Sequence, residues 1–273
     1  MKRSLPAVAV NAALIVIAAI ALGPLLWMLS ASLMPAGEAN HLPPRLVPSV
    51  PTFEHYAALL GRLNLARQLG NSLIVSVSAT IISVVLNGMA GYAFAKLRFS
   101  GRDRLFQILL AGLVIPAQVG MLPLFLLLER MGLVNTMVGV IVPSMVTIFG
   151  IFMVRQYALG IPDEMLDAAR IDGASESSIF WTIVMPLLRP ILAKLAVFTF
   201  LSTWNDFMWP LVILSDEAKY TLPVALANLS GEHVQDTELM MAGAVLTVLP
   251  VLLVFLFLQR QYVRGLLLGS VKG

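Results

Sequence analysis

Long apolar stretches alternate with shorter polar stretches along the whole chain. A helix needs about 20 apolar residues to cross the hydrocarbon core of a bilayer. The stretches that satisfy this requirement are residues 7–30, 71–95, 105–128, 137–154, 191–214 and 240–258. The pattern therefore predicts an all-α polytopic membrane protein with six transmembrane helices, which form a single domain over residues 1–273.

The composition agrees with lipid as the main solvent. Of the 273 residues, 59% are hydrophobic and 12% are charged, and the mean hydropathy is +0.88. A soluble domain usually carries about 25% charged residues, so this chain has about half the usual charge. The first apolar stretch is long enough to span a bilayer and no small-residue cleavage site stands out after it, so we expect a retained first span.

The positions of lysine and arginine predict the orientation, because cytoplasmic loops are enriched in both residues. With the N-terminus inside, 13 of the 18 basic residues face the cytoplasm, and residues 96–104 and the tail 259–273 are the most basic connections. Both termini are then cytoplasmic. The pI of about 9.4 is explained by this topology without a nucleic-acid partner. The basic residues left outside are Arg45, Arg62, Arg67, Arg130 and Lys219.

Several kinds of chemistry find no support in the sequence. There is no cysteine, and the three histidines, His41, His55 and His233, are far apart, so we expect no metal site. No Gly-x-x-x-x-Gly-Lys-Ser/Thr phosphate loop occurs, and no catalytic group of residues stands out. We therefore expect a protein that binds no cofactor, is not an enzyme and depends on a partner for energy.

The cytoplasmic stretch 160–186 is the least lipid-like part of the chain. Pro162 followed by acidic residues predicts the start of a helix, Gly173 predicts its end, and a second helix is expected after Ser175. Small residues at three- and four-residue spacing predict one shared helix face that another body can approach closely. That face contains Met165, Ala168, Ala169 and Asp172.

Two interpretations of this stretch are open. An amphipathic hairpin could lie on the membrane surface, but such helices usually present lysine and arginine to the head groups. Here the acidic residues outnumber Arg170, which favours a protein-docking element. The acidic residues are Asp163, Glu164, Asp167, Asp172 and Glu176.

The same stretch carries a family resemblance. The runs Asp167-Ala168-Ala169 and Asp172-Gly173-Ala174, followed by Phe180, Ile183 and Pro186, resemble the EAA loop of bacterial ABC importer permeases. In that family the loop forms coupling helices that sit in a groove on a cytoplasmic ATPase. One departure is Asp167, which stands where the family usually has the longer glutamate. The resemblance implies a coupling site made of Glu164, Asp167, Ala168, Ala169, Asp172, Gly173, Ala174, Phe180 and Pro186.

Two further motifs extend the resemblance. Residues 201–210 resemble the fifth-span signature of carbohydrate importers of the maltose and glycerol-phosphate type. The tail 259–273 resembles the ending of the maltose-type second permease subunit, which reaches between the two ATPase subunits. The resemblance implies a bacterial inner-membrane permease for a sugar or related solute. It also implies a second homologous permease, two ATPase subunits that hold ATP and Mg, and an external solute-binding protein.

Polar residues inside a span are costly and invite a functional explanation. Asn205 and Asp206 are expected in the middle of the fifth span, flanked by Trp204 and Trp209. They could line a translocation path, or they could form hydrogen bonds that fix helix packing. An ion-coupled carrier is the rival function, although such carriers usually contain several intramembrane charges and Asp206 is the only clear one here.

Two other regions carry weaker signals. The outer loop 215–239 could contact a binding protein or serve as a solvated connector; the candidate contact residues are Tyr220, Thr221, Leu222 and Pro223. In the second and third spans, glycine and proline predict close packing and a broken helix. These residues are Asn87, Gly88, Gly91, Pro116, Gln118, Gly120 and Pro123.

Overall fold

The computed structural model describes residues 4–43, 45–61, 64–232 and 236–270, and their side chains over 8–43, 45–61, 64–228 and 236–256. Within these ranges the regular structure is helical throughout, without a strand. The all-α prediction is confirmed. The chain divides into two compact units. The first unit contains residues 1–66 and 225–273, and the second contains residues 67–224.

Four of the described helices are long and apolar enough to cross a membrane. They are Val8–Ala31, Leu65–Lys96, Glu176–Trp204 and Thr237–Leu256. Two bent helix pairs also pass the same test, so the described residues contain four to six spans. The polytopic class of the prediction is confirmed, whereas the count of six and the cytoplasmic termini stay predictions.

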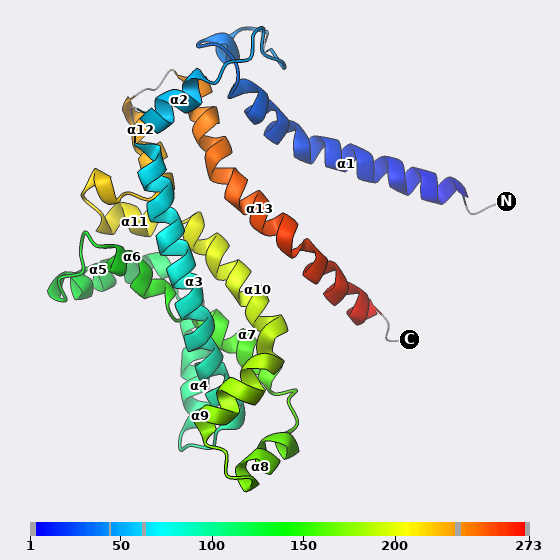
Figure 1. Ribbon diagram of the computed structural model, residues 1–273, viewed down its shortest axis with the longest axis vertical. Coiled ribbons are helices and arrows are strands. Elements are labelled where there is room, and N and C mark those ends of the chain that lie inside the picture. The colour runs from blue at the N-terminus through cyan, green and yellow to red at the C-terminus, as the bar shows by residue number, and fades with distance from the viewer. Residues whose placement is uncertain (1–3, 44, 62–63, 233–235, 271–273) are drawn as a thin grey trace. The chain divides into compact units, whose positions relative to one another are not determined.

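In the first unit, α1 (Ser4–Ala31) and α13 (Thr237–Ser270) meet at one end and are joined there by η1 (Glu38–Asn40) and α2 (Glu54–Gly61) (Figure 1). Ala31, Met34 and Ala39 form a small apolar core at this junction. The buried Glu238 carboxylate accepts the Ala39 N–H at 2.7 Å. The apolar window of α1 buries none of its residues within the chain, so lipid or another protein must cover it.

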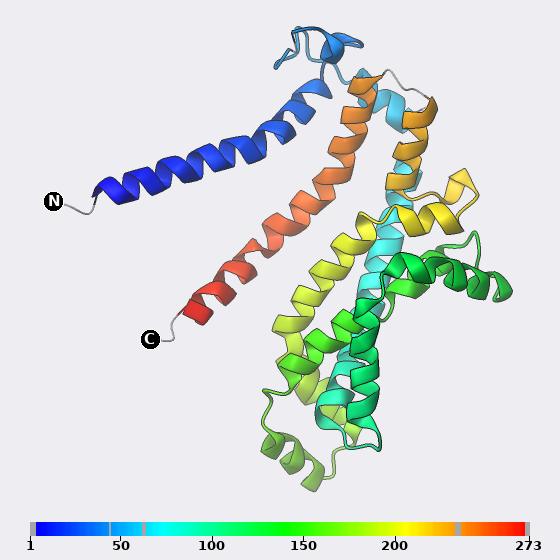
Figure 2. The ribbon, with the colours of Figure 1, turned by 180° about the vertical axis from the view of Figure 1, so that it is seen from behind.

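The second unit is built around α3 (Leu65–Lys96). Figures 1 and 2 show α3 and α10 (Met185–Trp204) side by side. The shorter helices are α4 (Arg102–Ala111), α5 (Met121–Arg130), α6 (Met137–Ile141), α7 (Ile148–Ala158), α8 (Asp163–Ile171), α9 (Glu176–Ile179), α11 (Met208–Ile213) and α12 (Leu222–Glu232), the last of which continues into the first unit.

A buried polar seam joins α3 to its neighbours. Ser83 Oγ lies 3.3 Å from Thr199 Oγ1 of α10. Asn87 donates to Ser83 O at 2.7 Å, and its own Oδ1 accepts the Thr147 N–H at 3.1 Å. Polar side chains inside membrane bundles commonly fix helix packing in this way. The Asn87 contact satisfies a backbone N–H immediately before α7, where the fourth predicted span is bent by 42°.

The predictions of close packing and of a broken helix are confirmed. A Cβ atom on Gly91 would lie 2.6 Å from Val154 of α7, so only glycine permits this approach. The third predicted span, 105–128, is not one straight helix. It bends by 101° between Val114 and Ala117, where Ile115 is extended and is followed by Pro116. The residue before a proline is disfavoured in the α conformation, which ends the helix.

The predicted boundaries of the fifth span, 191–214, are wrong. The helix starts at Glu176, passes through a π-turn at Phe180–Val184 and ends at Trp204. Pro186 and Pro190 do not end it, and the π-turn immediately precedes the first of them. Asn205 and Asp206 therefore lie after the helix, before the separate helix α11, and not in the middle of a span.

The described residues that qualify as the sixth span are Thr237–Leu256, close to the predicted 240–258. Helix α13 continues through Ser270 without a break at residue 258. The side chains of the predicted tail 259–273 and all of residues 271–273 lie outside the described part of the chain.

Candidate functional site

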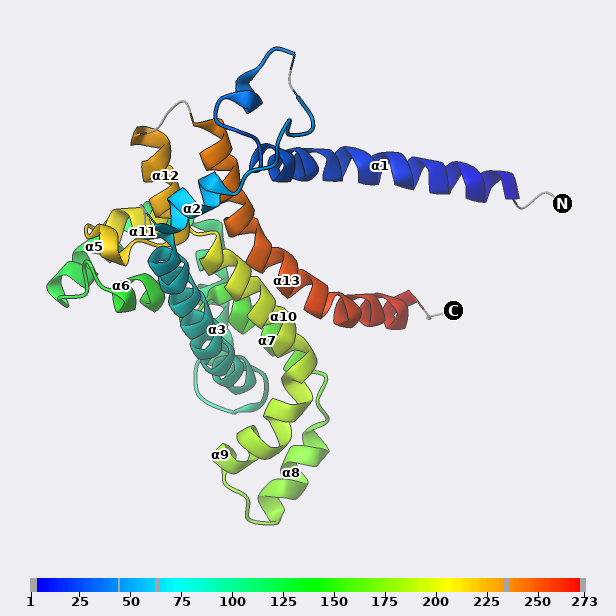
Figure 3. The same cartoon turned by 45° about the horizontal axis from the view of Figure 1, so that its top comes forward.

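The candidate site is the helical hairpin α8–α9 at one end of the second unit (Figure 3). Pro162 precedes α8, and Asp163 and Glu164 occupy its first turn, where negative charge is favourable. Gly173 ends the helix with φ +84°, a conformation that glycine adopts without steric cost. Ser175 then accepts the Ser178 N–H at 3.2 Å and starts α9. The predicted start, end and restart of the helix are confirmed.

One face of α8 holds the hairpin against the rest of the unit. Leu166 is 1% exposed, and Ala169 and Ala174 pack against the same apolar cluster, which includes Tyr92 of α3 and Phe180. Burying these apolar groups anchors the hairpin through the hydrophobic effect. Ala169 therefore does not belong to an open face shared with Met165, Ala168 and Asp172. In this respect the sequence-based assignment is wrong.

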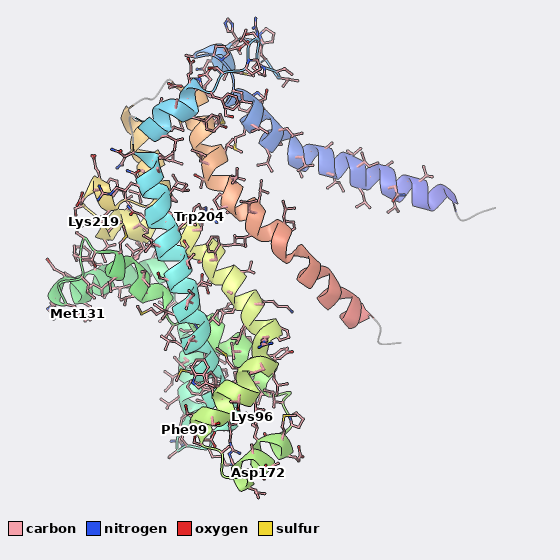
Figure 4. The ribbon with its side chains drawn as sticks, in the orientation of Figure 1. Lys96, Phe99, Met131, Asp172, Trp204 and Lys219 are labelled. Carbon is pink, nitrogen blue, oxygen red and sulfur yellow. The ribbon has the colours of Figure 1, made fainter. Side chains whose placement is uncertain are left out.

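The opposite face of α8 is exposed. It offers the predicted docking residues Glu164, Asp167, Ala168, Asp172 and Gly173. Figure 4 labels Asp172 at the tip of this end of the unit. Two apolar residues accompany them, since Met165 is 44% exposed and Ile171 is 86% exposed. Pro186 is also exposed, near the start of α10, whereas Phe180 is buried.

Arg170 ties the hairpin together. Its Nη1 donates to Asp167 Oδ1 and its Nε donates to Glu176 Oε1, both at 2.7 Å. Glu176 Oε2 also accepts the Tyr92 hydroxyl at 2.9 Å. The hydrogen bonds to Glu176 and Asp167 raise the pKa of the Arg170 guanidinium. The Asp167 carboxylate, predicted to serve a docking contact, therefore also has a partner within its own chain.

Lys96 attaches the start of α8 to the end of α3. Its Nζ donates to Ile161 O at 2.6 Å and to Asp163 Oδ1 at 2.7 Å. The Lys96 side chain is 5% exposed and that of Asp163 is 74% exposed. The hydrogen bond from Lys96, together with its positive charge, lowers the pKa of Asp163. The α8–α9 hairpin is thus fastened to α3 at two points, Lys96 and Tyr92.

Sequence reasoning missed Lys96, Tyr92 and Ile171 as residues of this site. In the sequence, Tyr92 lies within the apolar stretch 71–95, and Lys96 opens the basic connection that follows it. The sequence signal for Ile171 was its position on α8, on the side opposite the buried Leu166. An apolar residue predicted to face water there indicates a surface for a partner.

The predicted path residues lie around the end of α10. Trp204 is buried and stacks on Phe200, and the buried Trp209 donates its indole N–H to Gly139 O at 3.0 Å. Asn205 is exposed, with its Nδ2 bonded to Leu201 O at 2.8 Å. Asp206 accepts the Trp209 N–H at 3.3 Å. Both tryptophans thus contribute to packing, and Asn205 is the most accessible of the four.

The residues of the predicted binding-protein contact lie at the end of the segment that follows α11 and at the start of α12. Thr221 and Leu222 are buried, and the Leu222 N–H donates to Ser72 Oγ of α3 at 2.7 Å. Tyr220 and Pro223 are half-buried. The exposed residues of this segment are Ser215 and Glu217, which come just before the tyrosine. The loop 215–239 is also not a simple connector, because α12 occupies residues 222–232.

Comparison with known proteins agrees with this architecture. One solved structure, described as a bacterial ABC transporter involved in the import of the acidic polysaccharide alginate, has a chain that matches with a TM-score of 0.82. It is 26% identical, and the match covers 95% of this chain and 98% of the other.

Curated relatives match over almost the full length. The arabinooligosaccharides transport system permease protein AraQ of Halalkalibacterium halodurans is 40% identical, over 94% of this chain and 93% of the relative. The lactose transport system permease protein LacG of Rhizobium radiobacter is 30% identical, over 100% and 98%. Residues 83–267 match the family described as the binding-protein-dependent transport system inner membrane component. This chain belongs to that family of bacterial inner-membrane transport components.

Proposed function

We propose that this chain is the permease subunit of an ABC importer that takes up a sugar or an oligosaccharide. The relatives support the substrate class, since their names give arabinooligosaccharides and lactose, and a third, from Streptomyces coelicolor, is named for diacetylchitobiose uptake and is 34% identical. The proposed partners are a second homologous permease, two cytoplasmic ATPase subunits that hold ATP and Mg, and an external solute-binding protein.

The observation that carries the coupling role is the two-sided character of α8. Its inner face is fixed to α3 by Leu166 and Lys96, while its outer face is exposed, acidic and carries the apolar Ile171. A helix held in this way can transmit a displacement of its docking partner to the membrane helices. Closure of the ATPase pair would then move α3 and α10 between inward-open and outward-open arrangements.

The path role of Asn205 and Asp206 follows from their place at a helix break. Irregular backbone at membrane depth is tolerated where it is buried in protein or lines a water-filled cavity. The exposed amide of Asn205 is the group best placed to contact a solute hydroxyl. The segment containing Glu217 is proposed to face the solute-binding protein.

The test is to co-purify the partners from membranes in mild detergent with wild type and an Ala168→Trp variant. Ala168 is exposed on α8, so the larger side chain blocks a docking surface without disturbing the apolar cluster. Gly173→Trp is less suitable because the left-handed backbone at Gly173 strains any other residue. The matched control is Met131→Trp, a 59% exposed position after α5 in the second unit.

We expect wild type and the control to retain both the ATPase and the second permease, and Ala168→Trp to lose only the ATPase. Reconstituted transport should stop in the same variant. If wild type purifies alone and accumulates sugar with an ion gradient but without ATP, the importer-subunit function is wrong and the ion-coupled carrier replaces it.

A further inference from the structure

The loop between α3 and α4 carries a concentration of positive charge that the coupling role does not use. Residues 98–104 line a concavity of about 880 Å³, here called the arginine loop. The loop contains three arginines and one aspartate. Figure 4 places its Phe99 at the same end of the second unit as Lys96 and Asp172.

One arginine of the loop already has bonded partners. Arg102 Nε donates to Asp103 Oδ1 at 3.2 Å, and its Nη1 donates to Leu97 O at 3.2 Å. These contacts neutralise the single aspartate and fix the backbone of the turn. Arg98 and Arg104 are both exposed, and neither makes an ion pair or a hydrogen bond within the described part of the chain. The concavity therefore presents two positive charges without bonded anions, although Arg98 lies near enough to Asp163 for its charge to help lower the pKa of that carboxyl.

An aromatic base holds the arginine loop in place. The rings of Phe99 and Phe94 lie 5.9 Å apart, and those of Phe94 and Phe106 lie 5.5 Å apart. Arg155 of α7 stacks at 4.0 Å over Phe106 and donates to Phe94 O at 3.2 Å. A turn that is held by packed rings loses little further freedom when a ligand binds, which favours affinity.

An apolar surface adjoins the charges. Leu105 is 49% exposed and Ile108 is 68% exposed, and Ile108 lies four residues after Arg104, on the same helix face. Helix α4 is the first half of a bent pair that qualifies as a membrane span. With this pair as a span, Arg104 lies at the junction between an apolar helix and a polar loop, which is the level expected for phospholipid head groups.

We propose that the arginine loop binds an anionic phospholipid of the cytoplasmic leaflet. Arg98 and Arg104 hold the head-group phosphate, and an acyl chain runs along Leu105 and Ile108. A free anion would bind the arginines but would leave the apolar side chains of Leu105 and Ile108 without a contact. An acidic protein surface would match the charges but would not cover side chains at membrane depth.

The test uses the assembled transporter in nanodiscs of phosphatidylcholine with a minor fraction of phosphatidylglycerol. After extraction into detergent, native mass spectrometry counts the phosphatidylglycerol molecules retained per complex. The test variant is Arg98→Gln/Arg104→Gln. The matched control, Arg67→Gln/Arg130→Gln, removes the same charge from two exposed arginines elsewhere in the second unit. Each arginine near an anionic membrane surface contributes about the same free energy to lipid binding. Removing two arginines should therefore weaken lipid binding about 30-fold.

We expect the test variant to lose one retained phosphatidylglycerol that wild type and the control keep, with phosphatidylcholine unchanged. Inorganic phosphate added at physiological ionic strength should not displace the lipid. Equal lipid loss in both double variants, or displacement by inorganic phosphate alone, would overturn the proposal. Loss of the ATPase from the test variant with the lipid retained would assign the arginine loop to protein docking instead. The lipid count requires no transport activity, so it stands apart from the proposed sugar uptake.

Discussion

Replacing Lys96 by methionine should loosen the α8–α9 hairpin from α3. Methionine keeps the length and the apolar stem of the side chain but cannot donate to Ile161 O or Asp163, which the ammonium contacts at 2.6 and 2.7 Å. Asp163 is mostly exposed, so its ion pair contributes little because solvent screens it. The carbonyl of Ile161, a residue that is 6% exposed, is the more serious loss.

The magnitude follows from the charge and burial of that contact. A hydrogen bond with a charged donor contributes about 1.5–3 kcal/mol, and an unpaired buried acceptor costs a similar amount. A local destabilisation of about 2–3 kcal/mol increases the open fraction, meaning the fraction of molecules in which α8 is detached from α3, about 30- to 140-fold. The docking face would stay intact, because none of its exposed residues changes.

Hydrogen exchange of the α8 amides in the assembled transporter measures the open fraction directly. Transported sugar per ATP hydrolysed should fall as well, because a loosened α8 transmits less of the ATPase motion. Lys194→Met, at an exposed lysine of α10, is the control and should resemble wild type. Equal exchange rates in Lys96→Met and Lys194→Met would refute the reasoning, since the buried contact would then contribute nothing to the attachment.

Two further predictions follow from the same unit. Gly91→Ala should destabilise the complex by about 1–3 kcal/mol because its methyl group would lie 2.6 Å from Val154, whereas Gly88→Ala should be nearly neutral because its nearest contact is 3.6 Å. Thermal unfolding of the purified complex compares the two, and equal midpoints would contradict the packing account. The α8 attachment should not change between pH 8 and 5. Lys96 lowers the pKa of Asp163 from its ordinary 3.8, so the ion pair contributes at any pH above that value and is lost as the pH falls through the lowered pKa. Hydrogen exchange of the α8 amides, corrected for its intrinsic pH dependence, tests whether the attachment is independent of pH. A transition in the corrected exchange rate near pH 6 would contradict the prediction.

Local features of the α8–α9 hairpin were predictable because their causes are local. The acidic first turn after Pro162, the end at Gly173 and the restart at Ser175 each depend on residues within one helical turn. The broken third span was foreseen for the same reason, since Pro116 restricts the residue before it. Membrane insertion of the chain was also predictable from the sequence, because it depends on hydropathy over about 20 residues.

The fifth span shows where local reasoning fails. The apolar run resumes at residues 207–214 after the polar pair Asn205 and Asp206. Hydropathy averaged over about 20 residues includes this pair within one span and does not mark the helix end at Trp204. The break depends on tertiary contacts, in which Trp209 packs into the unit and donates to Gly139 O. Thr221 and Leu222 are likewise buried because Ser72 and Asn71 of α3 fix the backbone around them.

The sequence by itself determined that lipid is the main solvent, that the fold is helical, and where the apolar segments and the boundaries of α8 lie. Periodicity, capping and hydropathy act over a few turns of helix, so one chain segment contains all the information they need. The tertiary structure alone decided which face of α8 is open and that Lys96 and Tyr92 fasten it. It also decided that Arg102 and Arg155 have bonded partners, whereas Arg98 and Arg104 form no hydrogen bond or ion pair within the part of the chain that the structure describes. These properties depend on residues up to 84 positions apart, such as Tyr92 and Glu176, and only folding brings such residues within hydrogen-bonding distance.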